Sequence, residues 1–83
     1  MTRGNPMHVN NPLDELIQQA LIKYGLTNEV IRQQLGITRA TYTKYRKNPL
    51  LLSAGHIIRL SDIIHVSPQR IFLIISELPR EQG

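Results

Sequence analysis

The chain has 83 residues, a hydrophobic fraction of 41% and a formal net charge of +4, so we expect one domain with its own core and not two domains. The absence of cysteine excludes a disulfide framework and a thiolate metal site. No apolar run approaches the roughly 20 residues that a membrane span needs, and the start of the chain lacks the apolar stretch of a secretory signal. We therefore expect a cytoplasmic protein.

Residues 1–11 are predicted to form a flexible arm, because glycine, proline and asparagine interrupt any periodicity there. Disorder is the ordinary state of a terminus, and we favour it over an arm that places Arg3 and His8 on a phosphate backbone. The globular domain is predicted to cover residues 12–79, followed by a tail at 80–83.

The first helix is predicted to begin at Pro12 with Asn11 as N-cap, because proline lacks the N–H that goes unpaired at this position. Asp14 and Glu15 fall in its first turn, where the helix dipole favours negative charge. Gly25 ends the helix as a left-handed C-cap. The apolar residues recur at helical spacing and form one stripe: Leu13, Leu16, Ile17, Ala20, Leu21 and Tyr24.

Two short helices joined by a turn containing glycine are predicted next. Thr27 or Asn28 caps the second helix, and Gly36 stops it. Thr38 caps the third helix, which ends at Asn48-Pro49 because proline disfavours a helical residue before it. The side chains expected to lock the third helix across the second are Ile31, Leu35, Ile37, Tyr42 and Tyr45.

The leucines of the connector at 50–53 are expected to fill the core. Ser53 then caps a fourth helix through about His65, and Ser67-Pro68 begins a fifth that reaches Leu78. No segment alternates apolar and polar residues as a strand does. We therefore predict an all-α fold of five helices.

The indication of function lies in residues 38–49, which hold four basic side chains and no acidic one. The third helix presents a basic face with small residues, and a helix of this width fits the DNA major groove. Arg39, near the helix start, is placed for a base edge, where arginine pairs best with guanine. Lys44, Arg46 and Lys47 fit phosphate contacts. The outward face as a whole comprises Thr38, Arg39, Ala40, Thr43, Lys44 and Lys47.

The stretch LTNEVIRQQLGITRATYTKYRKNP resembles the helix-turn-helix of the lambda repressor and Cro (Xre-type) family, and IIHVSPQRIF is similar to the family's entry to its fifth helix. The matching positions are Leu26, Thr27, Leu35, Gly36, Ile37, Thr38, Arg39, Ala40, Thr41, Tyr42, Tyr45, Val66, Ser67, Pro68, Ile71 and Phe72. The resemblance covers about residues 13–78.

The resemblance implies a five-helix lambda-repressor-like domain whose third helix is the recognition helix, and it implies a phosphate contact for Asn28. It further implies a sequence-specific regulator of a phage or mobile element, which acts by occupying an operator in double-stranded DNA as a symmetric dimer. The two recognition helices of such a dimer lie one turn apart, roughly 34 Å. The protein would then act at the nucleoid of a bacterial or phage-infected cell.

Two positions depart from the family pattern. Arg32 stands where the family usually has a small residue packed against the recognition helix, so its side chain must snorkel or push the helices apart. Arg46 stands where the family often has glutamate, and we expect it to add a phosphate contact.

The run from Arg70 to Leu78 is more apolar than one buried face needs. Ile71, Phe72 and Ile75 are expected to fill the core, and we predict a dimer interface from the residues that then point away: Leu73, Ile74 and Leu78. The alternative is that the N-terminal segment covers this face.

Other classes of function fit the sequence less well. Tyr42 and Tyr45 could stack on single-stranded bases, but their spacing favours the core. His8, His56 and His65 match no short metal-ligand spacing, and no catalytic motif is present. We expect no enzyme, no cofactor and no small-molecule ligand. A protein-interaction module with the same fold, such as an antitoxin or a phage-assembly adaptor, is the alternative function.

Overall fold

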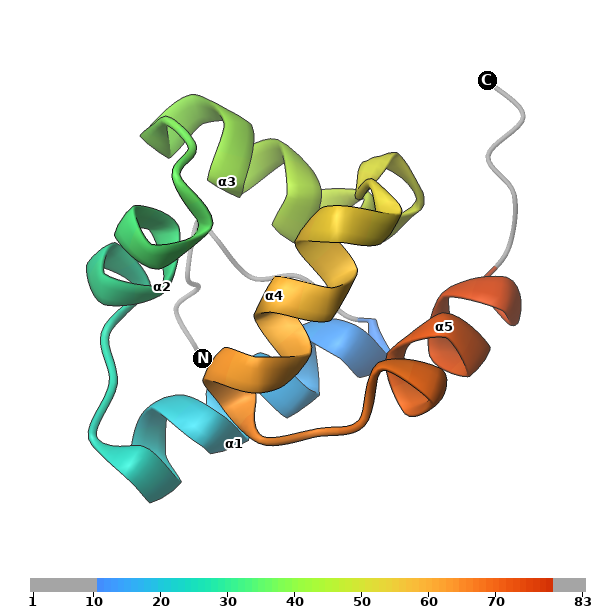
Figure 1. Ribbon diagram of the computed structural model, residues 1–83, viewed down its shortest axis with the longest axis horizontal. Coiled ribbons are helices and arrows are strands. Elements are labelled where there is room, and N and C mark those ends of the chain that lie inside the picture. The colour runs from blue at the N-terminus through green and yellow to red at the C-terminus, as the bar shows by residue number, and fades with distance from the viewer. Residues whose placement is uncertain (1–10, 79–83) are drawn as a thin grey trace, which may run out of the picture.

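The structure, a computed structural model, describes residues 11–78, and within them it contains five α-helices and one short 3-10 helix but no strand (Figure 1). The helices are α1 (Pro12–Tyr24), α2 (Asn28–Leu35), α3 (Arg39–Lys47), α4 (Ala54–Ile64) and α5 (Pro68–Ser76), with η1 (Pro49–Leu51) between α3 and α4. This confirms the all-α prediction. Of the arm predicted for residues 1–11, residues 1–10 with Arg3 and His8 lie outside the described residues, as does the tail, and Asn11 is the N-cap of α1.

Each α-helix starts at a polar N-cap whose side-chain oxygen accepts a hydrogen bond from a backbone N–H in the first turn. Asn11 Oδ1 accepts from the N–H of Asp14 at 2.7 Å, and the hydroxyls of the other four caps do the same for their helices. A cap of this kind stabilises a helix by about 1 kcal/mol. The predicted caps are confirmed, and for α2 the cap is Thr27 rather than Asn28.

Three helices end at a left-handed residue. Gly25 (φ 65°) and Gly36 (φ 73°) take the conformation that a side chain disfavours. At the end of α4 the same position holds His65 (φ 61°). Its ring lies 4.3 Å from the ring of Tyr24, between centroids, with the two planes tilted by 40°, and this contact ties the ends of α1 and α4 together.

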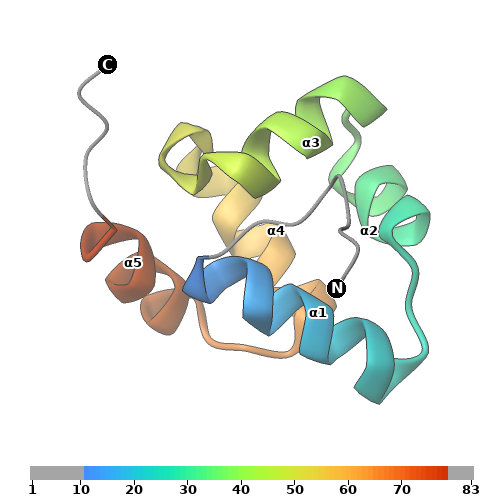
Figure 2. The same ribbon diagram turned by 180° about the vertical axis from the view of Figure 1, so that it is seen from behind.

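The helix α4 runs through the middle of the domain and packs against α1, α2 and α5 (Figures 1 and 2). The buried apolar side chains come from all five helices: Leu13, Ile17, Ala20, Ile31, Leu35, Tyr42, Ile57, Leu60, Ile63, Ile64 and Ile71. The connector only partly fills the core as predicted, because Leu52 packs against it whereas Leu51 is 48% exposed. Among the described helices, none has both the length and the apolar character needed to cross a membrane.

The helix α5 is oriented differently from the prediction. Ile71 is fully buried, and Ile74 and Ile75 lie one turn further along the same face and pack partly against the core. Phe72 was expected inside and Ile74 outside, and both expectations are wrong. The exposed apolar residues of this helix are Phe72 (43%) and Leu73 (58%); Leu78 follows the helix and is half-buried.

Candidate nucleic-acid interface

The turn between α2 and α3 fixes how the two helices cross. The N–H of Gly36 donates to the carbonyls of Arg32 (3.0 Å) and Gln33 (3.1 Å), which closes the end of α2. Ile37 then packs partly into the core, and Thr38 starts α3 by accepting the N–H of Thr41. As a result α3 lies along the outer edge of the domain, with one long side facing away from it (Figure 1).

The outward side of α3 matches the prediction except at one residue. The side chain of Arg39 is 81% exposed. The remaining outward residues are spaced along one helical face and are exposed or, for Thr43, half-buried: Thr38, Ala40, Thr43, Lys44 and Lys47. The helix itself carries no acidic residue. Basic side chains and small side chains therefore share one surface, and the small ones leave room for a bound molecule to come close to the backbone of α3.

Arg46 does not belong to this face. It is 5% exposed, and its Nε donates to Asp14 Oδ1 at 2.7 Å while Nη2 forms an ion pair with the same oxygen. Asp14 is 3% exposed, so it is a buried partner of Arg46 as well as a first-turn charge of α1. The predicted phosphate contact of Arg46 is therefore wrong, because its guanidinium is used inside the domain.

The other end of the Arg46 guanidinium reaches α2. Nη1 donates to Asn28 Oδ1 at 2.6 Å and to the Tyr42 hydroxyl at 3.0 Å, and that hydroxyl donates to the same Asn28 oxygen at 2.6 Å. Burial raises the pKa of the Tyr42 hydroxyl. One network, buried at Asp14, Tyr42 and Arg46 and exposed at Asn28, thus joins α1, α2 and α3.

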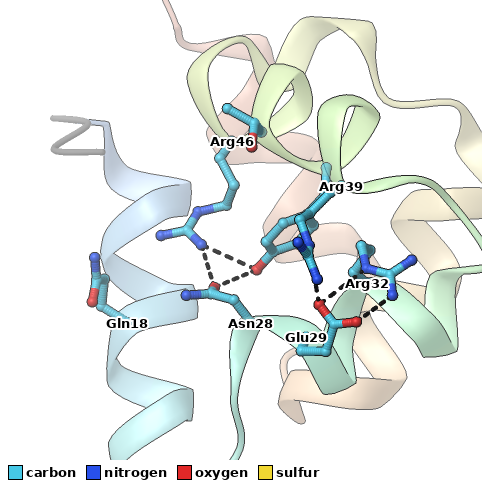
Figure 3. Close-up of a pocket in the computed structure, with 8 residues that line it drawn as sticks. Gln18, Asn28, Glu29, Arg32, Arg39 and Arg46 are labelled. Atoms are coloured by element: carbon cyan, nitrogen blue, oxygen red, sulfur yellow. Dashed lines mark hydrogen bonds and ion pairs between the residues drawn. The ribbon is translucent and has the colours of Figure 1, made fainter. Parts of the chain in front are cut away.

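This network orients the side-chain amide of Asn28. Because arginine can only donate, the oxygen of the amide must face Arg46 and its Nδ2 must point away. Figure 3 shows that Nδ2 points toward Gln18 on α1, across an open groove between α1, α2 and α3. Asn28 is exposed, so the fold presents a fixed N–H donor beside α3, as a phosphate contact requires.

Changing Asn28 to aspartate separates the two roles of this residue. The variant keeps an oxygen for Tyr42 and Arg46, so we expect it to fold, but it replaces the Nδ2 donor with a negative charge. Binding to duplex DNA should weaken by about 1.5–3 kcal/mol, the contribution of a hydrogen bond to a charged group. Fluorescence anisotropy measures this, with Gln34→Glu as the control at an exposed position of α2. An equal loss in both variants would contradict a contact by Asn28.

The long side chain of Arg32, at a position where we expected either snorkelling or separated helices, extends toward the α2–α3 turn. Its Nη1 donates to the carbonyl of Ile37 at 2.8 Å, and Nε and Nη2 bind the carboxylate of Glu29. The side chain therefore snorkels to the turn rather than separating the helices. Glu29 was not among the predicted site residues, although its spacing of three from Arg32 indicates a helical ion pair.

The two tyrosines take different positions in the domain. Tyr42 is 6% exposed, which confirms it as a core residue, and Tyr45 is half-buried with its ring centroid 5.6 Å from that of His56. Across residues 11–78, no three side chains of the metal-binding types gather at one place.

The groove between α1, α2 and α3 has a volume of 480 Å³ and is open, and Asn28, Arg39 and Thr43 line it.

Comparison of the chain with models of protein families, with curated proteins and with solved structures finds no match. The geometry of the α2–α3 region is therefore the observation that bears on function.

Proposed function

We propose that the protein is a sequence-specific double-stranded DNA-binding regulator that uses α2 and α3 as a helix-turn-helix and acts by occupying its operator. The observation that supports this most directly is the outward face of α3, where exposed cations and small side chains lie on a helix held rigidly from behind. Two sets of bonds hold the helix in this way: those of Arg46 to Asp14 and Asn28, and the hydrogen bond from Arg32 to the carbonyl of Ile37 in the turn.

Each group on this surface has a distinct task in the proposed complex. Arg39, at the first position of α3, reaches a guanine edge in the major groove. Lys44 and Lys47 contact phosphates, and the amide of Asn28 contacts another phosphate. Such contacts add affinity through release of counterions, while specificity comes from Arg39 and its small neighbours.

Selection of binding sites from random duplex DNA tests the proposal. We expect one preferred sequence with two-fold symmetry.

Arg39→Ala should then cost about 1–3 kcal/mol of binding free energy on the selected site and relax the preference at one base pair. Lys47→Ala should weaken binding to all duplexes alike. It should also reduce by about 1 the salt slope, which is the slope of log affinity against log salt concentration. Recovery of no preferred sequence would rule out a sequence-specific regulator.

The exposed Phe72 and Leu73 on α5 support a symmetric dimer as the binding unit, and they also favour the one alternative we retain. In that alternative the protein is an interaction module, such as an antitoxin or a phage-assembly adaptor, whose α5 meets a different protein. A partner that co-purifies with the chain in stoichiometric amount, together with no preference among duplexes, would support the interaction module instead.

A further inference from the structure

Glu29 is the acidic residue that lines the groove beside α3. Its Oε1 lies 3.6 Å from Arg39 Nε and accepts from Arg32 Nε at 3.3 Å, and its Oε2 pairs with Arg32 Nη2 (Figure 3). Gln33 Nε2 donates to Oε2 at 3.3 Å. One carboxylate therefore joins two guanidinium groups, one from within α2 and one from the first residue of α3.

The position of this carboxylate is itself fixed. Arg32 is held to the α2–α3 turn by its bond to the carbonyl of Ile37, and it grips Glu29 through two nitrogens. The hydrogen bond from Arg32 lowers the pKa of the Glu29 carboxyl, as expected for a carboxylate gripped by a guanidinium. Because Glu29 is anchored, its contact with Arg39 restrains a side chain that is 81% exposed.

The contact has two consequences for Arg39. The ion pair is made through Nε, which leaves the terminal Nη groups to form a bidentate pair with a guanine edge. It also gives Arg39 a nearby counter-charge, and a fixed carboxylate at this place repels phosphate oxygens. Both effects oppose a loose contact between Arg39 and any DNA backbone that it meets.

We propose that Glu29 is a specificity-determining residue: it aims Arg39 at a base edge and disfavours its use on phosphate, with Arg32 as the residue that positions Glu29. This inference rests on the proposed function and assigns a role to a carboxylate that a purely electrostatic view of DNA binding would regard as unfavourable.

The test compares wild type and Glu29→Gln on the selected duplex and on a scrambled duplex of equal composition. Glutamine keeps the shape but lacks the charge that restrains Arg39. We expect Glu29→Gln to bind the scrambled duplex more tightly than wild type does, with a salt slope steeper by about 1. The ratio of the affinity for the selected duplex to the affinity for the scrambled duplex should fall about tenfold. Asp62→Asn, at an exposed position of α4, makes the same charge change at a residue that does not line the groove beside α3 and should leave the ratio unchanged.

The Arg39→Ala background separates a direct effect of Glu29 from an effect through Arg39. There, Glu29→Gln should lower the ratio no further; an additional tenfold fall would overturn the inference. Thermal unfolding checks that each variant folds. If Glu29→Gln is unfolded, Glu29→Asp keeps the first-turn charge, withdraws the carboxylate from Arg39, and should also lower the ratio.

The outcomes distinguish the two proposals. If wild type binds both duplexes equally, the proposed function fails. If wild type discriminates and folded Glu29 variants discriminate equally well, the function stands and the role of Glu29 is overturned.

Discussion

Replacing Asp14 by asparagine should cost the domain about 3–5 kcal/mol of unfolding free energy, the range measured when one partner of a buried ion pair is removed. Asp14 is 3% exposed and Arg46 is 5% exposed, so the variant leaves a guanidinium buried without its counter-charge. A whole domain is stable by only about 5–15 kcal/mol. Urea unfolding followed by circular dichroism should therefore show a midpoint shifted to much lower denaturant.

Two further variants make this result specific to the buried pair. Glu15→Gln removes the same charge from the next residue of α1, which is exposed, and should change stability by no more than about 0.5 kcal/mol. The double variant Asp14→Leu with Arg46→Met removes both charges and should recover most of the lost stability. A loss for Asp14→Asn no larger than that for Glu15→Gln would show that the pair is not needed.

The parts of the fold that could be predicted are those specified by neighbouring residues. Thr38 and Ser53 cap helices with bonds that span three residues, and Gly25 and Gly36 end helices through their own backbone freedom. Such signals are complete within a few positions, so the order of the helices and their starts follow from them. The end of α5 has no such glycine, and the helix stops at Ser76 rather than at the predicted Leu78. Helical periodicity likewise identified Tyr42 as a core residue.

The placement of Arg46 could not be predicted in the same way, because its partner is 32 residues earlier in the chain. Arg46 stands one turn after Tyr42, on the inner face, and the periodicity alone indicates burial. Its charge suggested the surface instead, since arginine is almost never fully buried unless it is paired. Asp14 already had an explanation as a first-turn charge of α1, which concealed it as the partner.

Phe72 shows a second limit, because residues 71–75 are all apolar and periodicity cannot choose between the faces of a helix that is apolar all round. The choice is made by contact with α1 and α4, which takes Ile71 inward and leaves Phe72 and Leu73 outside. The predicted dimer surface therefore keeps Leu73, gains Phe72 and loses Ile74 to the core.

That surface leads to the second large effect that we expect. Leu73→Asp should leave the fold intact, since Leu73 is 58% exposed, and should convert a dimer into a monomer. In a two-fold interface the same patch occurs on both copies, so one substitution places two carboxylates in an apolar contact. Sedimentation equilibrium measures the mass directly.

Loss of the dimer should weaken binding to the full palindrome by about 10²–10⁴-fold, the gain that linking two binding events provides. Binding to a single half-site should be unchanged, because α3 is untouched.

The control is Ile22→Asp on α1, which adds the same charge at an apolar residue that is 84% exposed; it should affect neither the mass nor the affinity. The half-site comparison is decisive, because a substitution that damaged the DNA-binding surface itself would lower affinity for both DNAs, whereas separation of two intact copies lowers it only for the palindrome. A wild-type chain that sediments as a monomer at high micromolar concentration, or a Leu73→Asp variant that remains dimeric, would contradict an interface on α5.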